Sequence, residues 1–271
     1  MMDLIGHSTR PTVWGAVAAV ALGAASVAVA QPTSTELFEA HVEAVDGDNI
    51  RAEHDNRVTY GEFMPPDGSG PVLFTIWQQR EDQLRYSLEN PGLIGGLTRG
   101  FDGETGWEVS GAGLRMIETD SEEYSELVFG SEFDGENAWE TLYTEHEYVG
   151  ERTFRGQAVH EISATSKTGR EFDIFFSVET GIIVGKSSTR NGGSIVFTFE
   201  DYTDFGGILV PTVQRQIDQS GETVVRFRHI RYNVDEADMP QFTTPEIVAS
   251  ESDSGLGLMP ETGGDSDDNG G

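Results

Sequence analysis

The side chains that most often do chemistry in proteins are present in this sequence, but none stands in a recognised catalytic or metal-binding pattern. No two histidines have the spacing of metal ligands on a helix. The six histidines are His7, His41, His54, His146, His160 and His229. A lone histidine in a core or at a strand edge supports no particular reaction, so we assign structural roles to all six. We therefore predict no metal site and no cofactor.

The sequence also lacks the motifs of nucleophilic catalysis and of nucleotide binding. It contains no cysteine, which excludes thiol catalysis, thiolate metal sites and disulfides. It has no Gly-x-Ser-x-Gly turn and no glycine-rich phosphate loop. The 47 Asp and Glu residues are so numerous that no pair of carboxylates specifically indicates a glycosidase. We predict that the protein is not an enzyme and has no catalytic residues; a carboxylate-dependent hydrolase is the least favoured alternative.

Apolar and aromatic side chains, in contrast, recur at regular spacing and could bind an apolar ligand with no catalytic group. Each CH₂ that leaves water contributes about 0.8 kcal/mol, and a cavity lined by Leu, Ile, Phe and Trp would be dry. The residues that we predict to contact such a ligand are Phe74, Ile76, Leu84, Tyr86, Leu97, Trp107, Leu127 and Phe129. Ordinary core packing is the alternative role for each of them, and the commoner role of buried aromatic residues.

The charge of the chain restricts the partners that it can have. There are 47 acidic and 17 basic residues, which give a formal net charge of −30. Such a surface repels nucleic-acid phosphates and anionic membranes, so we predict no nucleic-acid partner. An acidic surface that is simply solvated, with no partner at all, is the alternative.

The two ends of the sequence differ in composition from the middle. Residues 12–30 form an apolar run that follows Arg10 and ends in Ala28-Val29-Ala30, which is typical of a signal peptide cleaved after residue 30. An uncleaved membrane anchor is the alternative. No later segment is long and apolar enough to span a membrane. Residues 245–271 are rich in Ser, Gly, Asp and Glu, which predicts a disordered acidic tail.

Residues 31–244 are therefore expected to form one domain, exported to the periplasm or another part of a bacterial envelope. Helical spacing of apolar residues predicts a helix over 36–45, capped by Thr33, Ser34 or Thr35, and a second from Thr119 or Asp120 to Phe129. Alternating residues separated by turn signals predict antiparallel strands elsewhere. The strand ranges are 58–63, 72–78, 83–88, 97–101, 107–109, 114–117, 147–154, 157–165, 171–178, 182–188, 195–202, 208–217 and 222–234. The fold class is mainly β (α+β).

Three strings, in their order, resemble a known family. They are FDGETGW at 101–107, FSVETGII at 176–183 and DYTDFGGILVP at 201–211. They are similar to segments of the LolA/LolB-like superfamily of outer-membrane lipoprotein carriers and receptors, and the resemblance covers roughly residues 35–240. It implies a curved antiparallel sheet that forms an incomplete β-barrel, with helices covering the concave face and acyl chains bound there.

The residues and the resemblance together predict a binding protein that holds an apolar ligand in a half-barrel cavity. The expected partner is a lipid or a lipidated protein, and the role is that of an envelope carrier. The alternative is an envelope sensor or scaffold that uses the same fold to bind a protein partner.

Overall fold

A computed structural model describes residues 31–89, 96–190 and 192–246 of the chain. The predicted signal peptide, 1–30, and all but the first two residues of the predicted tail, 245–271, lie outside the described residues. All helices and strands belong to one unit that begins at Pro32. None of the helices in the described part of the chain has the length and hydropathy of a membrane span.

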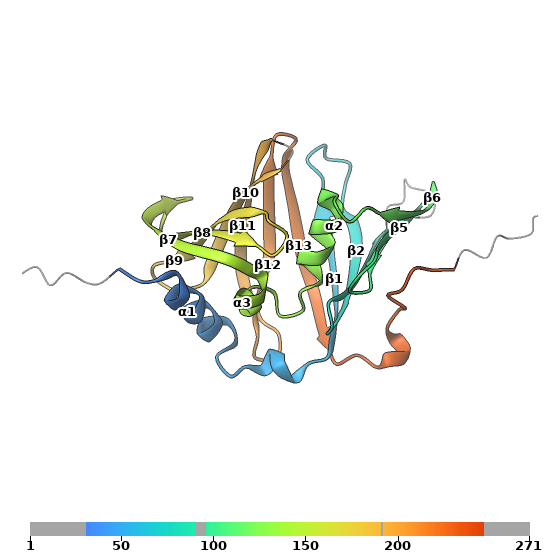
Figure 1. Cartoon of the computed structure of the whole chain (residues 1–271), viewed down its shortest axis with the longest axis horizontal. Helices are drawn as coiled ribbons and strands as arrows, with labels where there is room; N and C mark the ends of the chain where they lie inside the picture. Colours follow the sequence, from blue (N-terminus) through green and yellow to red (C-terminus); the bar gives the residue numbers. More distant parts are fainter. Residues whose placement is uncertain (1–30, 90–95, 191, 247–271) are drawn as a thin grey trace, which may run out of the picture. The chain divides into compact units, whose positions relative to one another are not determined.

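The strands form a single antiparallel sheet of 13 strands whose two edges do not pair (Figure 1). The order across the sheet is β6-β5-β4-β3-β2-β1-β13-β12-β11-β10-β9-β8-β7. The strands are β1 (Asn56–Met64), β2 (Val72–Gln79), β3 (Gln83–Glu89), β4 (Leu97–Phe101), β5 (Gly106–Ser110), β6 (Gly113–Ile117), β7 (Tyr143–Phe154), β8 (Gln157–Ser166), β9 (Glu171–Ser177), β10 (Ile183–Arg190), β11 (Gly193–Asp204), β12 (Leu209–Asp218) and β13 (Gly221–Tyr232). The predicted mainly-β fold class with one open, curved sheet is confirmed.

One pairing joins the two halves of the sheet. Strands β1–β6 form one meander, in which each strand pairs with the next along the chain, and β7–β13 form another. Among the described residues, only the pairing of β1 with β13 links strands that are distant in the sequence. The register shifts between Tyr60 and Gly61 in this pair, and a bulge of this kind bends and twists a strand. A Cβ atom at Gly61 would lie 2.3 Å from the ring of Phe74 and 2.5 Å from the carbonyl oxygen of Arg226, so the close packing at this position leaves no room for a side chain.

Helices and short 3₁₀ turns complete the fold. They are α1 (Ser34–Asp46), η1 (Ile50–Glu53), α2 (Glu122–Ser131), η2 (Gly135–Ala138), α3 (Trp139–Leu142) and η3 (Glu236–Asp238). Thr33 caps α1 in a capping box with Glu36, in which the Thr33 amide donates to the Glu36 carboxylate at 2.7 Å. The cap predicted for α2 at residue 119 or 120 is wrong: Ser121 accepts from the Tyr124 amide at 3.1 Å.

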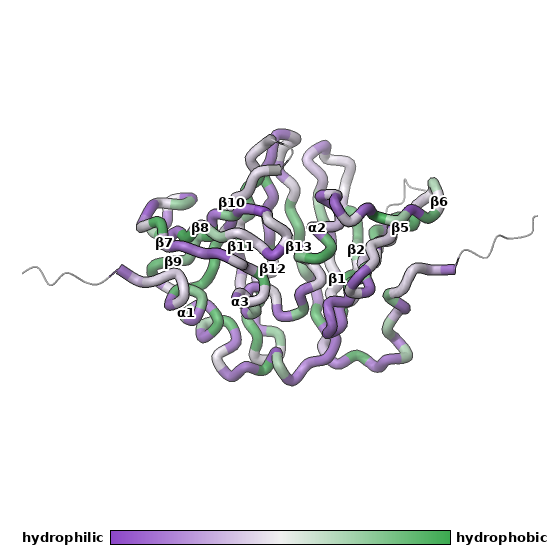
Figure 2. The backbone as a smooth tube through the Cα atoms, in the orientation of Figure 1, coloured by the Kyte–Doolittle hydropathy of each residue, from purple (hydrophilic) through white to green (hydrophobic). Residues whose placement is uncertain are grey.

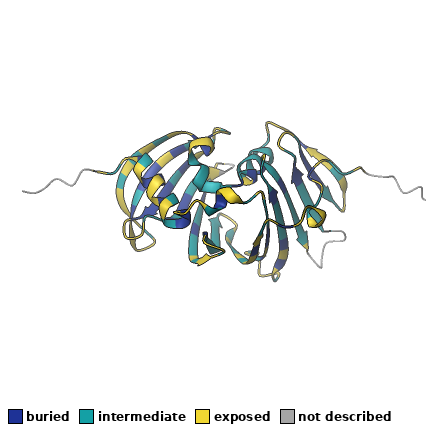
Figure 3. Cartoon of the chain, turned by 90° about the horizontal axis from the view of Figure 1, so that it is seen from below, coloured by how far each residue is buried: buried dark blue, intermediate teal, exposed yellow. Residues whose placement is uncertain are grey.

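The two longer helices cover opposite ends of the sheet. Along α1 and the strands, apolar and polar residues alternate, and buried positions recur along the strands (Figures 2 and 3). The cluster under α1 comprises Leu37, Phe38, Leu142, Tyr143, Ile162, Ala164, Phe172, Ile174, Phe176 and Ile183. The cluster under α2 comprises Leu84, Phe101, Ile117 and Leu127. The central strands lie between these two clusters.

The segment after η3 covers part of the outer face of the sheet. The indole Nε1–H of Trp107 donates to the carbonyl oxygen of Phe242 at 2.8 Å, and Arg85 donates to that of Gln241 at 3.0 Å. Phe242 and Trp107 are both buried. A Cβ atom on Gly100 would lie 2.1 Å from the Trp107 ring, so this indole lies flat against the neighbouring strand. Residues 241–242 therefore complete the outer core of β3–β5.

Phe38 is the central side chain of the cluster under α1, and its truncation tests that packing. Its ring is fully buried and stacks on Trp139 at 5.1 Å between centroids, with Phe176 edge-on at 5.3 Å. We expect Phe38→Ala to lower the free energy of unfolding by about 3–5 kcal/mol in urea titrations, because it leaves a cavity. The control, Val178→Ala at a residue that is 45% exposed, should change it by less than about 0.5 kcal/mol. A loss below about 1 kcal/mol for Phe38→Ala would contradict the packing described.

Candidate ligand-binding site

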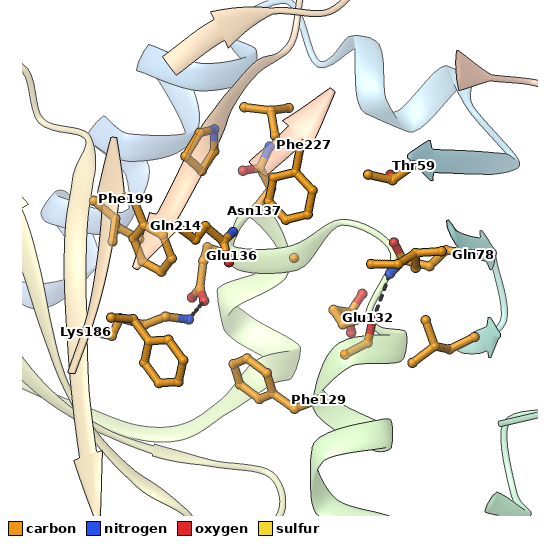
Figure 4. Close-up of a pocket in the computed structure, with 18 of the residues that line it drawn as sticks. Thr59, Gln78, Phe129, Glu132, Glu136, Asn137, Lys186, Phe199, Gln214 and Phe227 are labelled. Atoms are coloured by element: carbon orange, nitrogen blue, oxygen red, sulfur yellow. Dashed lines mark hydrogen bonds and ion pairs between the residues drawn. The ribbon is translucent and has the colours of Figure 1, made fainter. Parts of the chain in front are cut away.

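A cavity of about 650 Å³ lies between the central strands and the side chains of the helices that cross them (Figure 4). This volume is typical of small-molecule sites. Side chains of α1, η1, α2 and η2 line it from one side, and those of β1–β4 and β9–β13 from the other.

Much of the lining is apolar and aromatic. Inward-facing residues of β2 and β3 form one wall with α2, and the residues of β9–β13 form the other. The second wall was not predicted from the sequence, although its phenylalanines lie at alternating positions of strands that were predicted. Its apolar members are Phe172, Ile183, Phe197, Phe199, Leu209, Val210, Pro211, Phe227 and Ile230.

Of the eight residues predicted to contact a ligand, some line the cavity and others do not. Five of them line the cavity together: Ile76, Leu84, Tyr86, Leu127 and Phe129.

The other three predicted residues, Phe74, Leu97 and Trp107, do not line this cavity. Phe74 is buried and lies edge-on to the lining residue Phe227, at 5.9 Å between ring centroids. Leu97 pairs with Leu88 in the β3–β4 ladder, beyond the cavity. Trp107 alternates with Glu108, whose carboxylate meets the lining residue Arg99, so its indole faces the other side of the sheet. The alternation of side chains between the two faces of a strand can be predicted from the sequence, but which of the two faces is concave cannot.

The lining is not the purely apolar surface expected from the sequence, because charged side chains are part of it. The cations are Arg51, Arg57, Arg99, Arg170 and Lys186, and the carboxylates are Glu123, Glu126, Glu132 and Glu136. Most of them lie on short turns or at inward positions of strands that sequence periodicity alone does not distinguish from outward ones. The cavity is therefore amphiphilic.

The ion pair of Lys186 with Glu136 joins β10 to η2 at one end of the cavity (Figure 4). The Lys186 ammonium also lies 5.0 Å from the ring centroid of Phe129, on α2. The phenol of Tyr143 donates to the Glu136 carboxylate at 2.7 Å. Burial raises the pKa of Tyr143 well above its usual value, so this phenol stays protonated and donates at neutral pH.

The residues that connect β6 to β7, 118–142, are called the crossing segment here, and polar contacts hold them over the cavity. Arg80 makes a bidentate pair with the Asp134 carboxylate at 2.9 and 3.2 Å. The Gln78 amide donates to the carbonyl oxygen of Gly130 at 2.8 Å. Asn137 donates to the carboxylate of Asp46, at the end of α1, at 3.3 Å. The segment is thus attached at several points to the sheet and to α1.

The comparisons with known proteins agree with this fold. No protein-family model and no curated protein matches the chain. A LolA superfamily protein from Nitrosomonas europaea superposes with a TM-score of 0.55 at 12% identity, over 79% of this chain and 99% of that one.

Two further solved structures are similar at the same level. A DUF1329 family protein from Desulfovibrio piger has a TM-score of 0.53 at 12% identity, over 74% of this chain and 93% of its own. A domain from Vibrio parahaemolyticus described as an outer membrane lipoprotein-sorting protein domain has a TM-score of 0.50 at 15% identity, over 74% and 96%. The chain has a LolA-like fold, and the predicted resemblance is confirmed at the level of fold.

His41, which lines the cavity from α1, provides a test of burial by pH. Its Nδ1 accepts a hydrogen bond from the Ile183 amide at 3.2 Å. Burial lowers its pKa from 6.5 to about 4, with the charges of Arg51 and Lys186 acting in the same direction. The unfolded chain therefore binds one more proton between these pH values. The contribution of neutral, buried His41 to the free energy of unfolding is therefore complete above pH 6.5 and is lost as the pH falls to about 4.

We expect His41→Gln to reduce the loss of unfolding free energy between pH 7 and pH 4 by about 3 kcal/mol relative to the wild type. Glutamine can accept the same hydrogen bond but takes up no proton. Urea titrations at each pH measure the effect, with His229→Gln, at an exposed position, as the control. Parallel pH profiles for the wild type and His41→Gln would show that His41 is not buried as described.

Proposed function

We propose that the protein is an exported binding protein that holds the apolar chain of a lipid or lipidated protein in this cavity, as a carrier in a bacterial envelope. The observation that carries the proposal is the cavity itself, about 650 Å³ with two largely apolar walls, which the protein's own side chains leave unfilled. A carrier needs such a site, whereas a core needed only for stability would be packed to the density of a crystal.

Hydrophobic transfer is sufficient for useful affinity at such a site. A chain of twelve carbons gains on the order of 10 kcal/mol at about 0.8 kcal/mol per CH₂, before the costs of association are subtracted. The lining carboxylates Glu123, Glu132 and Glu136 each lie against a basic side chain. That pairing favours a structural role for them over acid–base catalysis, which supports a non-catalytic function.

Export and location are inferred from the sequence. The run at 12–30 has the composition of a cleaved signal, and the chain contains no cysteine. The neighbours named for the LolA superfamily and for lipoprotein sorting support an envelope role. We propose a periplasmic domain over residues 31–244.

Binding of a neutral apolar probe tests the proposal. We expect N-phenyl-1-naphthylamine to bind saturably at one molecule per chain, with enhanced fluorescence. Gln214 lines the cavity from β12 (Figure 4), and within the described ranges its side chain makes no hydrogen bond, although its backbone is part of the sheet. Gln214→Trp should therefore fill part of the cavity without breaking a side-chain hydrogen bond and weaken binding about tenfold or more. Leu73→Trp, at a residue that is 46% exposed, should bind as the wild type does.

The outcomes separate this proposal from its alternatives. Non-saturable probe binding, or equal binding by the wild type and Gln214→Trp, would contradict a ligand in the cavity. Pull-down from an envelope extract that yields a stoichiometric protein and no lipid would favour the sensor or scaffold function. Turnover of envelope glycans by the purified protein would favour the hydrolase.

A further inference from the structure

The cavity contains unpaired positive charge although the protein is strongly acidic. The chain has only 17 basic residues against 47 acidic ones. Arg51, Arg57 and Arg170 all line the cavity. Across residues 31–89, 96–190 and 192–246, no carboxylate lies within ion-pair distance of any of these three guanidinium groups. A guanidinium group that lines a cavity is less well solvated than one on the surface, so the absence of a carboxylate beside these three requires an explanation.

Arg57 and Gln78 lie side by side at one end of the cavity. They are cross-strand partners in the β1–β2 ladder, and the Arg57 Nε donates to the side-chain Oε1 of Gln78 at 2.7 Å. The guanidinium packs over the ring of Phe133 at 5.3 Å. Burial and, to a smaller extent, the charge of Arg51 lower the pKa of Arg57 to about 10. The group nevertheless remains charged at neutral pH, so the cavity retains its charge.

Arg51, on η1, adds a second cation to this end of the cavity. Its side chain is buried, with 8% of the residue exposed. Its Nη1 donates to the carbonyl oxygen of Asp134 at 2.8 Å, and its Nε has no partner. The carboxylate of Asp134 is already held by Arg80 at 2.9 Å. A buried guanidinium with no anion is costly, and a ligand that brings a negative charge would reduce this cost.

The carboxylates of the lining have other partners. Glu136 pairs with Lys186, Glu123 pairs with Arg115 at 2.8 Å, and Glu126 also takes part in an interaction. Glu132 lies on the same side of the cavity as Gln78 (Figure 4), where Lys167 is 3.6 Å from its carboxylate. The corner formed by Arg51, Arg57 and Gln78, called the cationic corner here, is therefore not neutralised by the protein itself.

Apolar residues lead directly away from the cationic corner. Gln78 faces Leu84 across the β2–β3 ladder, and Ile76 is the next inward residue along β2. Both line the cavity, as does Phe227 from β13. A molecule whose charged end occupies the corner would thus lay its chain along this wall.

We propose that the ligand is an anionic amphiphile whose carboxylate or phosphate head group binds the cationic corner while its alkyl chain lies against Ile76, Leu84 and Phe227. This inference rests on the proposed function and names the chemical class of its ligand. The acidic exterior and the cationic corner then have different roles. The exterior repels anionic membrane surfaces, and the corner selects a single anionic molecule.

Ligands that share a ten-carbon alkyl chain but differ in head group test the inference on the wild-type protein. Decanoate, decyl phosphate, decanol and decyltrimethylammonium are titrated below their micelle concentrations, with displacement of N-phenyl-1-naphthylamine as the readout. Charge-assisted hydrogen bonds predict that decanoate and decyl phosphate bind at least about tenfold more tightly than decanol, and the ammonium compound no better than decanol. Inorganic phosphate alone should not compete with decanoate.

Variants locate the head group. Arg57→Met keeps the packing over Phe133, so we expect it to bind decanol as the wild type does but to lose the preference for decanoate. Arg57→Lys should recover part of that preference. Arg226→Met removes the same charge from an exposed site on β13 that does not line the cavity, and it should leave every affinity unchanged. Thermal unfolding of each variant confirms that it is folded.

The two proposals fail in different ways. Binding of neither the neutral probe nor decanol would contradict the cavity as a lipid site. Saturable decanol binding with no preference for decanoate in the wild type would overturn only the anionic class. Equal effects of Arg57→Met and Arg226→Met would overturn the corner, since a general charge effect would then explain the preference. Competition by inorganic phosphate at the affinity of decyl phosphate would indicate a site for free oxyanions and would also overturn it.

Discussion

The pairing of β1 with β13 determines the rest of the structure. It joins two consecutive meanders into one sheet of 13 strands, and it places β6 and β7 at the two far edges. Since β6 and β7 are consecutive in the sequence, the residues between them must cross the concave side. That crossing segment brings α2 over β3–β5, while α1 covers the other end. The cavity is the space that remains between the central strands and the side chains of α1, α2 and η2.

The walls of this cavity combine two kinds of physical interaction. Apolar and aromatic side chains supply the transfer energy for an alkyl chain, and ionic contacts hold the crossing segment over it, as in the half-buried pair of Arg80 with Asp134. Most buried charges in the lining are satisfied by such contacts. The guanidinium groups of Arg51 and Arg57 lie together in a part of the lining that has positive charge to offer a ligand. A mixed lining of this kind suits an amphiphile better than a hydrocarbon.

Much of the fold could be predicted from the sequence, because strand alternation, turn residues and helix caps are local signals. The two long helices and the strand ranges follow from them, apart from the Ser121 cap and the short helix and 3₁₀ turns. The site was predictable only in part. Ile76 and Leu84 line the cavity as expected, but Trp107 lies on the outer face under Phe242, and local periodicity does not distinguish the two faces. Arg51, Arg57 and Lys186 line one cavity because of the β1–β13 pairing and the position of the crossing segment, and both depend on long-range contacts.

The claim that the cavity holds an alkyl chain is tested most directly by native mass spectrometry of the protein purified from its own host. The account predicts a one-to-one adduct with the mass of a single lipid, removed by organic extraction and restored when the extract is added back. The bare polypeptide mass in the purified protein, with no adduct after incubation with that extract, would contradict it.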